Sequence, residues 1–133
     1  MVQGRGDGGS RWTVDLSPEA STVLRDLRTR DKAQYLAITS NLESLARLCC
    51  EIAPHDLEPV LHARFAYKPL KGDARKEGLL QIAIGRGDRY RAALLRLDPL
   101  RQILVVHLYS KNQQDKGIAR AIAIARERQD VDQ

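Results

Sequence analysis

Residues 78–109 read GLLQIAIGRGDRYRAALLRLDPLRQILVVHLY, and this stretch decides the fold. At its start Leu80, Ile82 and Ile84 alternate with other residues, which is the period-2 pattern of a strand. Glycine and aspartate at 85–88, and Asp98 with Pro99 further on, mark two turns. Strands joined by such short turns predict an antiparallel meander. The three strands are predicted at 80–84, 89–97 and 103–109.

A further strand and a helix are predicted before the meander. Trp12, Val14 and Leu16 alternate with polar residues, which indicates a first strand. Ser17 follows, and a proline and a glutamate come directly after it. This order is typical of a helix start, because the hydroxyl caps free N–H groups, proline suits the first helical position and the acid faces the positive end of the helix dipole. The sequence therefore predicts a helix at 18–29.

Two more helices complete the pattern. Asp31 is the expected cap of a helix at 32–53, with Gln34 three residues later as a possible capping-box partner. Apolar residues spaced three and four apart give this helix a buried stripe, and Pro54 ends it. Residues 54–77 are mixed in character and predict mostly loop, and a last helix is predicted at 114–129.

The predicted order is β-α-α-β-β-β-α, which places the chain in the α+β class. We expect a largely antiparallel, four-stranded sheet with helices on one face, which leaves the other face available for chemistry. The 133 residues fit a single domain. The expected division is a disordered tail at 1–10, the domain at 11–129 and a short tail at 130–133.

Positive charge is concentrated in one quarter of the chain. Residues 64–96 carry nine basic and three acidic side chains, whereas the net charge of the whole chain is only +5. A generally basic protein explains the overall charge but not this concentration. A dense basic segment is expected of a surface that contacts phosphate groups, so the sequence favours a nucleic-acid partner.

Composition argues against several other classes. Cys49 and Cys50 are neighbours within a helical pattern, where a mutual disulfide would be strained, and Cys49 falls on the apolar stripe. The histidines are scattered and show no metal-ligand spacing. No apolar run approaches membrane-spanning length, and residues 1–11 do not resemble a signal peptide. We therefore expect a cytoplasmic protein with no metal, no cofactor and no membrane contact.

Alternation within the strands selects candidate functional residues. On the strand 103–109 the even positions are all apolar and suit a core, whereas the odd positions end in His107 and Tyr109. Arg89 and Arg91 share a face of the preceding strand, and two arginines cannot be buried cheaply. We expect them to face outward, beside the two rings.

Metal-independent cleavage of RNA needs only side chains of these types. A base takes the proton of the 2′-hydroxyl, cations stabilise the charged phosphorane and an acid protonates the leaving 5′-oxygen. Each candidate also has a simpler explanation. His107 could hydrogen-bond a backbone carbonyl, Tyr109 could lie at the sheet rim, and Arg89 and Arg91 could be solvated edge charges. The same holds for the basic loop residues, which are Lys68, Lys71, Arg75 and Lys76.

Four segments in this order resemble the RelE superfamily of toxins, including its HigB-like members. Trp12–Glu19 resembles the family's first strand running into Ser-Pro-Glu, and Lys68–Gly72 its Lys-x-Leu-Lys/Arg-Gly loop. Gly78–Ile84 followed by Arg89–Arg91 is similar to its second and third strands. Val106–Lys111 resembles the Leu-His-x-aromatic-x-Lys strand before the last helix. The similarity covers roughly residues 12–128.

The resemblance implies a metal-independent endoribonuclease that cuts messenger RNA on the ribosome and is neutralised by an antitoxin. Arg91 matches the family's catalytic arginine after tyrosine, and Lys71 matches a basic loop residue that approaches RNA. Tyr109 and Lys111 stand where the family has an aromatic and a basic residue. The expected catalytic residues are Arg91, His107, Tyr109 and Lys111, and the expected RNA-binding residues are Lys68, Lys71, Arg86 and Arg89.

The chain departs from the family on its second strand. Family members often have lysine or arginine where this chain has Gln81 and Ala83, so His107 and Tyr109 are both open as the general base. A non-catalytic RNA- or ribosome-binding module on the same fold is therefore the main alternative. A DNA-binding regulator is a weaker one, because no recognition helix with polar side chains on one side stands out.

Overall fold

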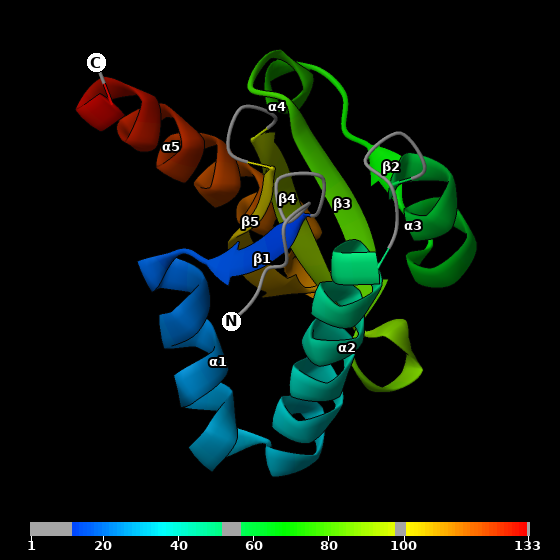
Figure 1. Cartoon of the computed structure of the whole chain (residues 1–133). Coiled ribbons are helices and arrows are strands. Elements are labelled where there is room, and N and C mark those ends of the chain that lie inside the picture. The colour runs from blue at the N-terminus through cyan, green and yellow to red at the C-terminus, as the bar shows by residue number, and fades with distance from the viewer. Residues whose placement is uncertain (1–11, 52–56, 98–100, 133) are drawn as a thin grey trace.

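The chain is described here from a computed structural model, which covers residues 12–51, 57–97 and 101–132 (Figure 1). The predicted tail at 1–10, the helix end at Pro54 and the turn at Asp98 and Pro99 lie outside these residues. In chain order the elements are β1 (Thr13–Leu16), α1 (Pro18–Arg30), α2 (Lys32–Glu51), α3 (Leu57–Phe65), β2 (Lys68–Pro69), α4 (Asp73–Lys76), β3 (Leu79–Ile84), η4 (Arg86–Asp88), β4 (Tyr90–Leu97), β5 (Gln102–Ser110), η6 (Lys111–Gln113) and α5 (Gln114–Asp132).

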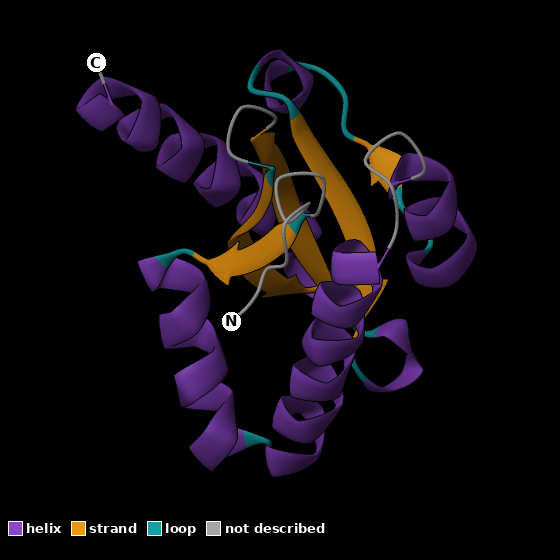
Figure 2. Cartoon of the chain, in the orientation of Figure 1, coloured by secondary structure: helices purple, strands orange, loops and turns teal. Residues whose placement is uncertain are grey.

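The strands form one sheet in the order β1-β5-β4-β3-β2 (Figure 2). β3, β4 and β5 make the predicted antiparallel meander, and the α+β class is confirmed. β1 lies parallel to β5, with Thr13 opposite Gln102. The sheet is one strand wider than the predicted four, because β2 adds a short antiparallel edge with Lys68 opposite Gln81. A proline is tolerated there, since an edge strand can spare an N–H donor.

The segment predicted as mostly loop contains two helices as well as β2. Helix α3 buries Leu61 and Phe65, which are four residues apart and pack into the sheet core. Pro59 lies in the first turn of α3, where its missing N–H would have no intrahelical partner. The mixed composition of residues 54–77 hid this helix, because its apolar residues do not form a clear stripe and prolines lie within it and on its flanks.

Helices α1 and α2 form a hairpin on one face of the sheet, as predicted. The Ser17 hydroxyl oxygen accepts a hydrogen bond from the N–H of Ala20 at 3.0 Å and donates to the carbonyl of Val106 at 2.6 Å. Asp31 caps α2, because its Oδ1 accepts from the N–H of Gln34 at 3.2 Å. The core on this face includes the buried side chains of Trp12, Leu27, Ile38, Leu45, Leu61, Ile82, Leu94 and Ile103.

Helix α5 packs on the opposite face, so the prediction of helices on one face only is wrong. Its buried Ala121, Ile124 and Ala125 contact apolar side chains of β3, β4 and β5. Its backbone comes so close to the sheet that a Cβ on Gly117 would lie 2.1 Å from Cγ of Tyr109. The strands carry apolar residues on both faces, and burying both sets requires a second helical layer. α5 also continues to Asp132, where a tail from residue 130 was predicted.

A β-bulge changes which residues of β5 share a face. The register between β4 and β5 shifts between Ala93 and Leu94, so that Val106 has no residue opposite it. The prediction that the odd positions of β5 share one face is therefore wrong. Val105 packs in the core beneath α1 and α2, whereas Tyr109 packs with Val106 beneath α5.

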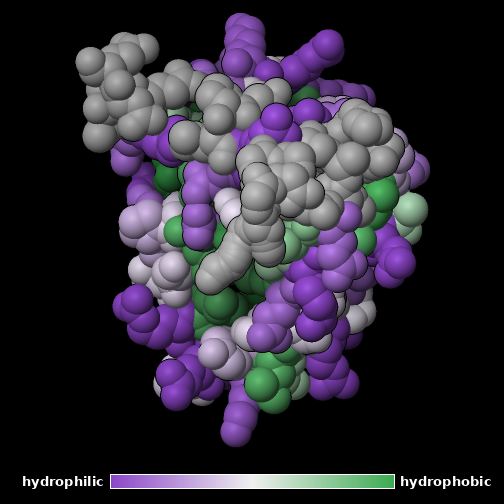
Figure 3. All heavy atoms as spheres, viewed as in Figure 1, coloured by the Kyte–Doolittle hydropathy of each residue, from purple (hydrophilic) through white to green (hydrophobic). Residues whose placement is uncertain are grey.

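The outer surface is mostly polar. In the space-filling view hydrophilic side chains cover most of the visible face, and apolar side chains show at its centre, between α1 and α2 (Figure 3). Leu36 is the one large apolar side chain found exposed among the described residues. Within the described ranges no helix combines the length and the apolar character that a membrane span needs.

Candidate functional site

Arg91 lies at one end of the sheet, on the face that carries Tyr109. In the register it stands between Ala83 on β3 and Tyr109 on β5. Its Nη1 donates to the carbonyls of Asp88 at 2.5 Å and Tyr90 at 3.0 Å. These bonds fix the half-buried side chain and leave the donors on Nη2 and Nε for a ligand. Arg91 is half-buried beside one of the two rings, but Arg89 follows η4 and lies outside β4, so the prediction that the two arginines share a strand face is wrong.

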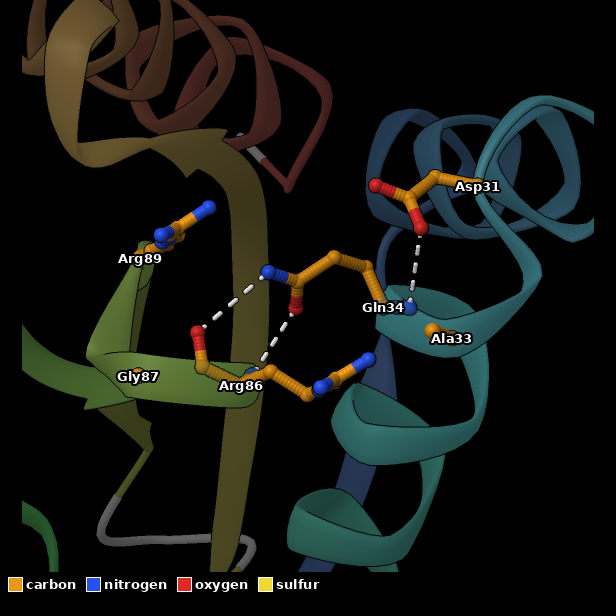
Figure 4. Close-up of a pocket in the computed structure, with 6 residues that line it drawn as sticks. All are labelled: Asp31, Ala33, Gln34, Arg86, Gly87 and Arg89. Atoms are coloured by element: carbon orange, nitrogen blue, oxygen red, sulfur yellow. Dashed lines mark hydrogen bonds between the residues drawn. The ribbon is translucent and has the colours of Figure 1, made fainter.

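The loop next to Arg91 is fastened to helix α2. The Gln34 side chain is 6% exposed, and its Oε1 accepts from the N–H of Arg86 at 2.9 Å while its Nε2 donates to the carbonyl of Arg86 at 3.3 Å (Figure 4). The N–H of Gly85 donates to Oδ1 of Asn41 at 2.8 Å. The Gln34 side chain therefore supports η4. It is not the capping-box partner of Asp31 that the sequence predicted.

Two adjoining hollows flank this loop, with volumes of about 340 and 420 Å³. They share Asp31, Gln34, Gly87 and Arg89, and we call them together the loop cleft. A hydrogen bond of 2.7 Å from the N–H of Lys111 to the carbonyl of Arg89 joins its walls. The other lining residues are Ala33, Arg86, Tyr90, Ser110, Lys111 and Asn112.

The loop cleft brings together three of the cations expected from the sequence. Arg86, Arg89 and Lys111 come from two segments of the chain, and all three are exposed. None of these three side chains forms an ion pair with a described residue. Because Arg91 is tied to the carbonyl of Asp88 in the same loop, its guanidinium adds to this positive region. Such an arrangement can hold an extended chain of phosphates.

The two lysines before the meander lie elsewhere. Lys68 is exposed on β2 opposite Gln81, two residues along the sheet from the row that contains Arg91. Lys71 follows Leu70, whose N–H donates to the carbonyl of Leu79 at the other end of β3. Four residues of strand separate that end from the Arg91 row, which is roughly 13 Å. The fold therefore does not bring Lys71 next to Arg91.

Tyr109 does not face solvent. Its side chain is 5% exposed and its hydroxyl donates to Oε1 of Gln81 at 2.9 Å. Burial raises the pKa of the Tyr109 hydroxyl well above its ordinary value, and the positive charge of Arg91 opposes only part of this rise. The prediction of a wet surface at this residue is wrong, because α5 lies on the ring at Gly117. In this arrangement the hydroxyl is neutral and already engaged.

His107 lies two residues before Tyr109 on β5 and stands opposite Ala93. The centroids of the His107 and Tyr109 rings are 5.9 Å apart. Burial lowers the pKa of His107, and the charge of Arg120 lowers it further, while Glu19 acts in the opposite sense. Its Nδ1 is buried and finds no hydrogen-bond partner among the described residues, so the simple carbonyl bond is not observed at that atom. His107 is thus a half-buried neutral ring beside the Glu19–Arg120 ion pair.

The polar groups that support the loop could not be recognised from the sequence. Gln34 and Arg86 are 52 residues apart, and each looks ordinary in its own segment. Asp31 was identified only as a helix cap. The one available signal was the glycine at 85, since its φ of +85° and a would-be Cβ 2.7 Å from Oε1 of Gln34 both require glycine. Within the described part of the chain, no cluster of potential metal ligands occurs.

The fold and the site define an α+β domain with a cationic cleft beside an anchored arginine. No known family model matches the sequence, and no curated protein matches it. Among solved structures, the RelBE2 toxin–antitoxin complex from Mycobacterium tuberculosis contains a similar chain. The two chains share 18% identity with a TM-score of 0.45, and the alignment covers 76% of this chain and 92% of the other. A likeness of this size does not establish a shared family.

Proposed function

We propose that this chain is the toxin of a toxin–antitoxin pair, an endoribonuclease that cuts messenger RNA on the ribosome in the cytoplasm. The observation that carries the proposal is the position of Arg91. This residue, which matches the catalytic arginine of RelE-like toxins, is held by two carbonyls at the edge of a cleft with three further cations. The antitoxin partner follows from the same sequence resemblance.

The reaction requires the protein mainly to position the RNA and to stabilise charge. The 2′-oxygen attacks the adjacent phosphorus, the bond to the 5′-oxygen breaks, and the products are a 2′,3′-cyclic phosphate and a 5′-hydroxyl. One proton leaves the 2′-hydroxyl and one is delivered to the 5′-oxygen, so no metal or external reactant is needed. Arg91 would stabilise the phosphorane, and Arg86, Arg89 and Lys111 would hold the neighbouring phosphates.

The proton carriers are assigned by elimination. Tyr109 is engaged with Gln81, and His107 stands opposite Ala93, two residues along the sheet from Arg91. Lys111 is exposed on the loop cleft and is hydrogen-bonded through its backbone to Arg89. We therefore assign Lys111 as the acid that protonates the leaving oxygen, and Lys68 on β2, opposite Gln81, is a further exposed basic group.

Induction of the gene tests the proposal directly. Expression should arrest growth, and co-expression of an adjacent antitoxin gene should relieve the arrest. Transcripts from arrested cells should carry cut ends with a cyclic phosphate, and purified chain with ribosomes should produce the same ends. Growth without cleaved transcripts would refute the proposal.

A non-catalytic RNA- or ribosome-binding module is the second candidate. It is favoured by Gln81 and Ala83, which stand on β3 where RelE-like toxins often have basic residues, and by the engaged hydroxyl of Tyr109. Both candidates predict binding that weakens steeply with salt, because each neutralised phosphate releases counterions. Tight binding to ribosomes with intact messenger RNA would favour the second candidate.

A further inference from the structure

The loop cleft contains a carboxylate that phosphate binding does not explain. Asp31 is exposed and lines both hollows, opposite Arg89. Its Oδ1 caps α2 by accepting from the N–H of Gln34, and the other oxygen is turned away from that bond (Figure 4). No described residue is bonded to this second oxygen. A carboxylate repels phosphate, so its place in a cationic cleft points to a ligand with N–H donors.

Capping alone does not require aspartate here. A serine or an asparagine caps a helix about as well, and either would leave the cleft without a negative charge. We therefore attribute the negative charge at this position to ligand binding and not to helix capping. Because Gln34 has both of its amide atoms bonded to Arg86, it cannot read a ligand in its place.

Guanine fits Asp31 and Arg89 on opposite walls of the cleft, and Arg86 and Lys111 then remain to hold phosphates. It is the base that presents two adjacent donors, N1–H and N2–H, on one edge and two adjacent acceptors, O6 and N7, on another. Arginine commonly binds the O6 and N7 pair with its planar fork. Adenine and cytosine offer one amino donor, and the N–H of uracil lies between two carbonyl oxygens that a carboxylate repels. Unstacked RNA bases are read in this way, and Tyr90 supplies a ring on the same wall.

The cleft has the size and position that such a role needs. Hollows of about 340 and 420 Å³ lie within the range of about 300–1,000 Å³ that is usual for small-ligand sites. Arg91 is bonded to Asp88 and Tyr90, the residues on either side of Arg89. A base in the loop cleft would therefore belong to a nucleotide next to the phosphate at Arg91. Building on the proposed function, we infer that the loop cleft selects guanine beside the cleaved phosphate, with Asp31 as the specificity-determining residue.

Two measurements test this inference. The first maps cut sites in messenger RNA for the wild type and for Asp31→Ser, which keeps the helix cap and removes the carboxylate. Guanine should dominate one fixed position beside the wild-type cuts. In Asp31→Ser the preference should fall by roughly tenfold or more, the usual size of one paired base contact. Asp73→Ser, which removes an exposed acid at the start of α4, is the matched control and should keep the preference.

The second measurement does not depend on cleavage. The four nucleoside 5′-monophosphates are titrated into the full chain, and the amide NMR signals of Gly87 and Lys111 are followed. Guanosine monophosphate should bind the wild type most tightly, and Asp31→Ser should bind all four alike. Equal binding of the four nucleotides by the wild type would overturn the inference, as would an unchanged guanine preference in Asp31→Ser. Guanine-selective binding without any cleavage would instead sustain the inference and count against the nuclease. Thermal melts confirm that each variant is folded.

Discussion

Replacing Arg91 with alanine should abolish cleavage and leave the fold nearly intact. The change removes the donors that would face the phosphorane, and losing one preorganised donor of this kind typically lowers a rate by about 10²–10³, or roughly 3–4 kcal/mol. It also removes the two bonds from Nη1 to the carbonyls of Asp88 and Tyr90. Both carbonyls lie near the surface, where water can replace the guanidinium, so the free energy of unfolding should fall by only about 1 kcal/mol.

The conservative variant separates charge from geometry. Arg91→Lys keeps the positive charge, but an ammonium cannot grip two phosphate oxygens while also bonding two carbonyls. We expect its cleavage rate to stay at least about tenfold below that of the wild type. Arg47→Ala, on the exposed surface of α2, removes the same charge away from the cleft and should cleave normally.

The assay compares the rate of transcript cutting on ribosomes for these variants, with urea unfolding as the measure of stability. The reasoning predicts a large loss of rate with a small loss of stability for Arg91→Ala. A folded Arg91→Ala variant that cuts as fast as the wild type would remove Arg91 from the mechanism. The non-catalytic module would then be the better account of the cleft.

Three further predictions concern the supports of the site. Gln34→Leu should leave the N–H and carbonyl of Arg86 without partners, which should lower the unfolding free energy by about 1–3 kcal/mol. Hydrogen exchange at the Arg86 amide should become faster, and slow exchange there would contradict the supporting role of Gln34. Gly117→Ala should clash with the Tyr109 ring. This overpacking should destabilise the fold by about 1–3 kcal/mol and outweigh the gain of about 1 kcal/mol in helix propensity. Urea unfolding measures the difference, and a more stable variant would refute this contact. The pKa of His107 lies below its ordinary value of 6.5, so the unfolded chain binds a proton more readily than the folded chain does. The unfolding free energy should therefore fall as the pH drops below 6.5 and level off below the folded pKa. His107→Gln should reduce that slope, and an equal slope in both proteins would show that other groups cause it.

The meander could be read from the sequence because its signal is local. Alternation within residues 78–109 located three strands to within a residue or two, and glycine and aspartate marked the turn between the first two. Ser17 and Asp31 were recognised as helix caps for the same reason, since each acts on N–H groups within three residues. Short-range chemistry of this kind leaves its pattern in adjacent residues.

Long-range contacts were the part that the sequence did not disclose. The shift at Ala93 and Leu94 depends on how two strands pair, and it places Tyr109 beneath α5 and not with Val105 beneath α1 and α2. Gln34 reaches a loop that is 52 residues away. Among the site residues, Arg91 lies beside Tyr109 as expected, but its half-buried position next to a buried ring was not predicted.

The pairing of β1 with β5 also sets the order in which the chain can fold during synthesis. The Ser17 hydroxyl donates to the carbonyl of Val106, 89 residues later, so the first strand cannot complete its contacts until β5 has been synthesised. At about 5–20 residues per second, this wait lasts roughly 5–18 s. The β3–β4 hairpin that carries Arg91 can form meanwhile, but η6 and Lys111 emerge only after β5. A protein proposed to act on ribosomes would therefore complete its cleft only after residues 102–113 have been synthesised.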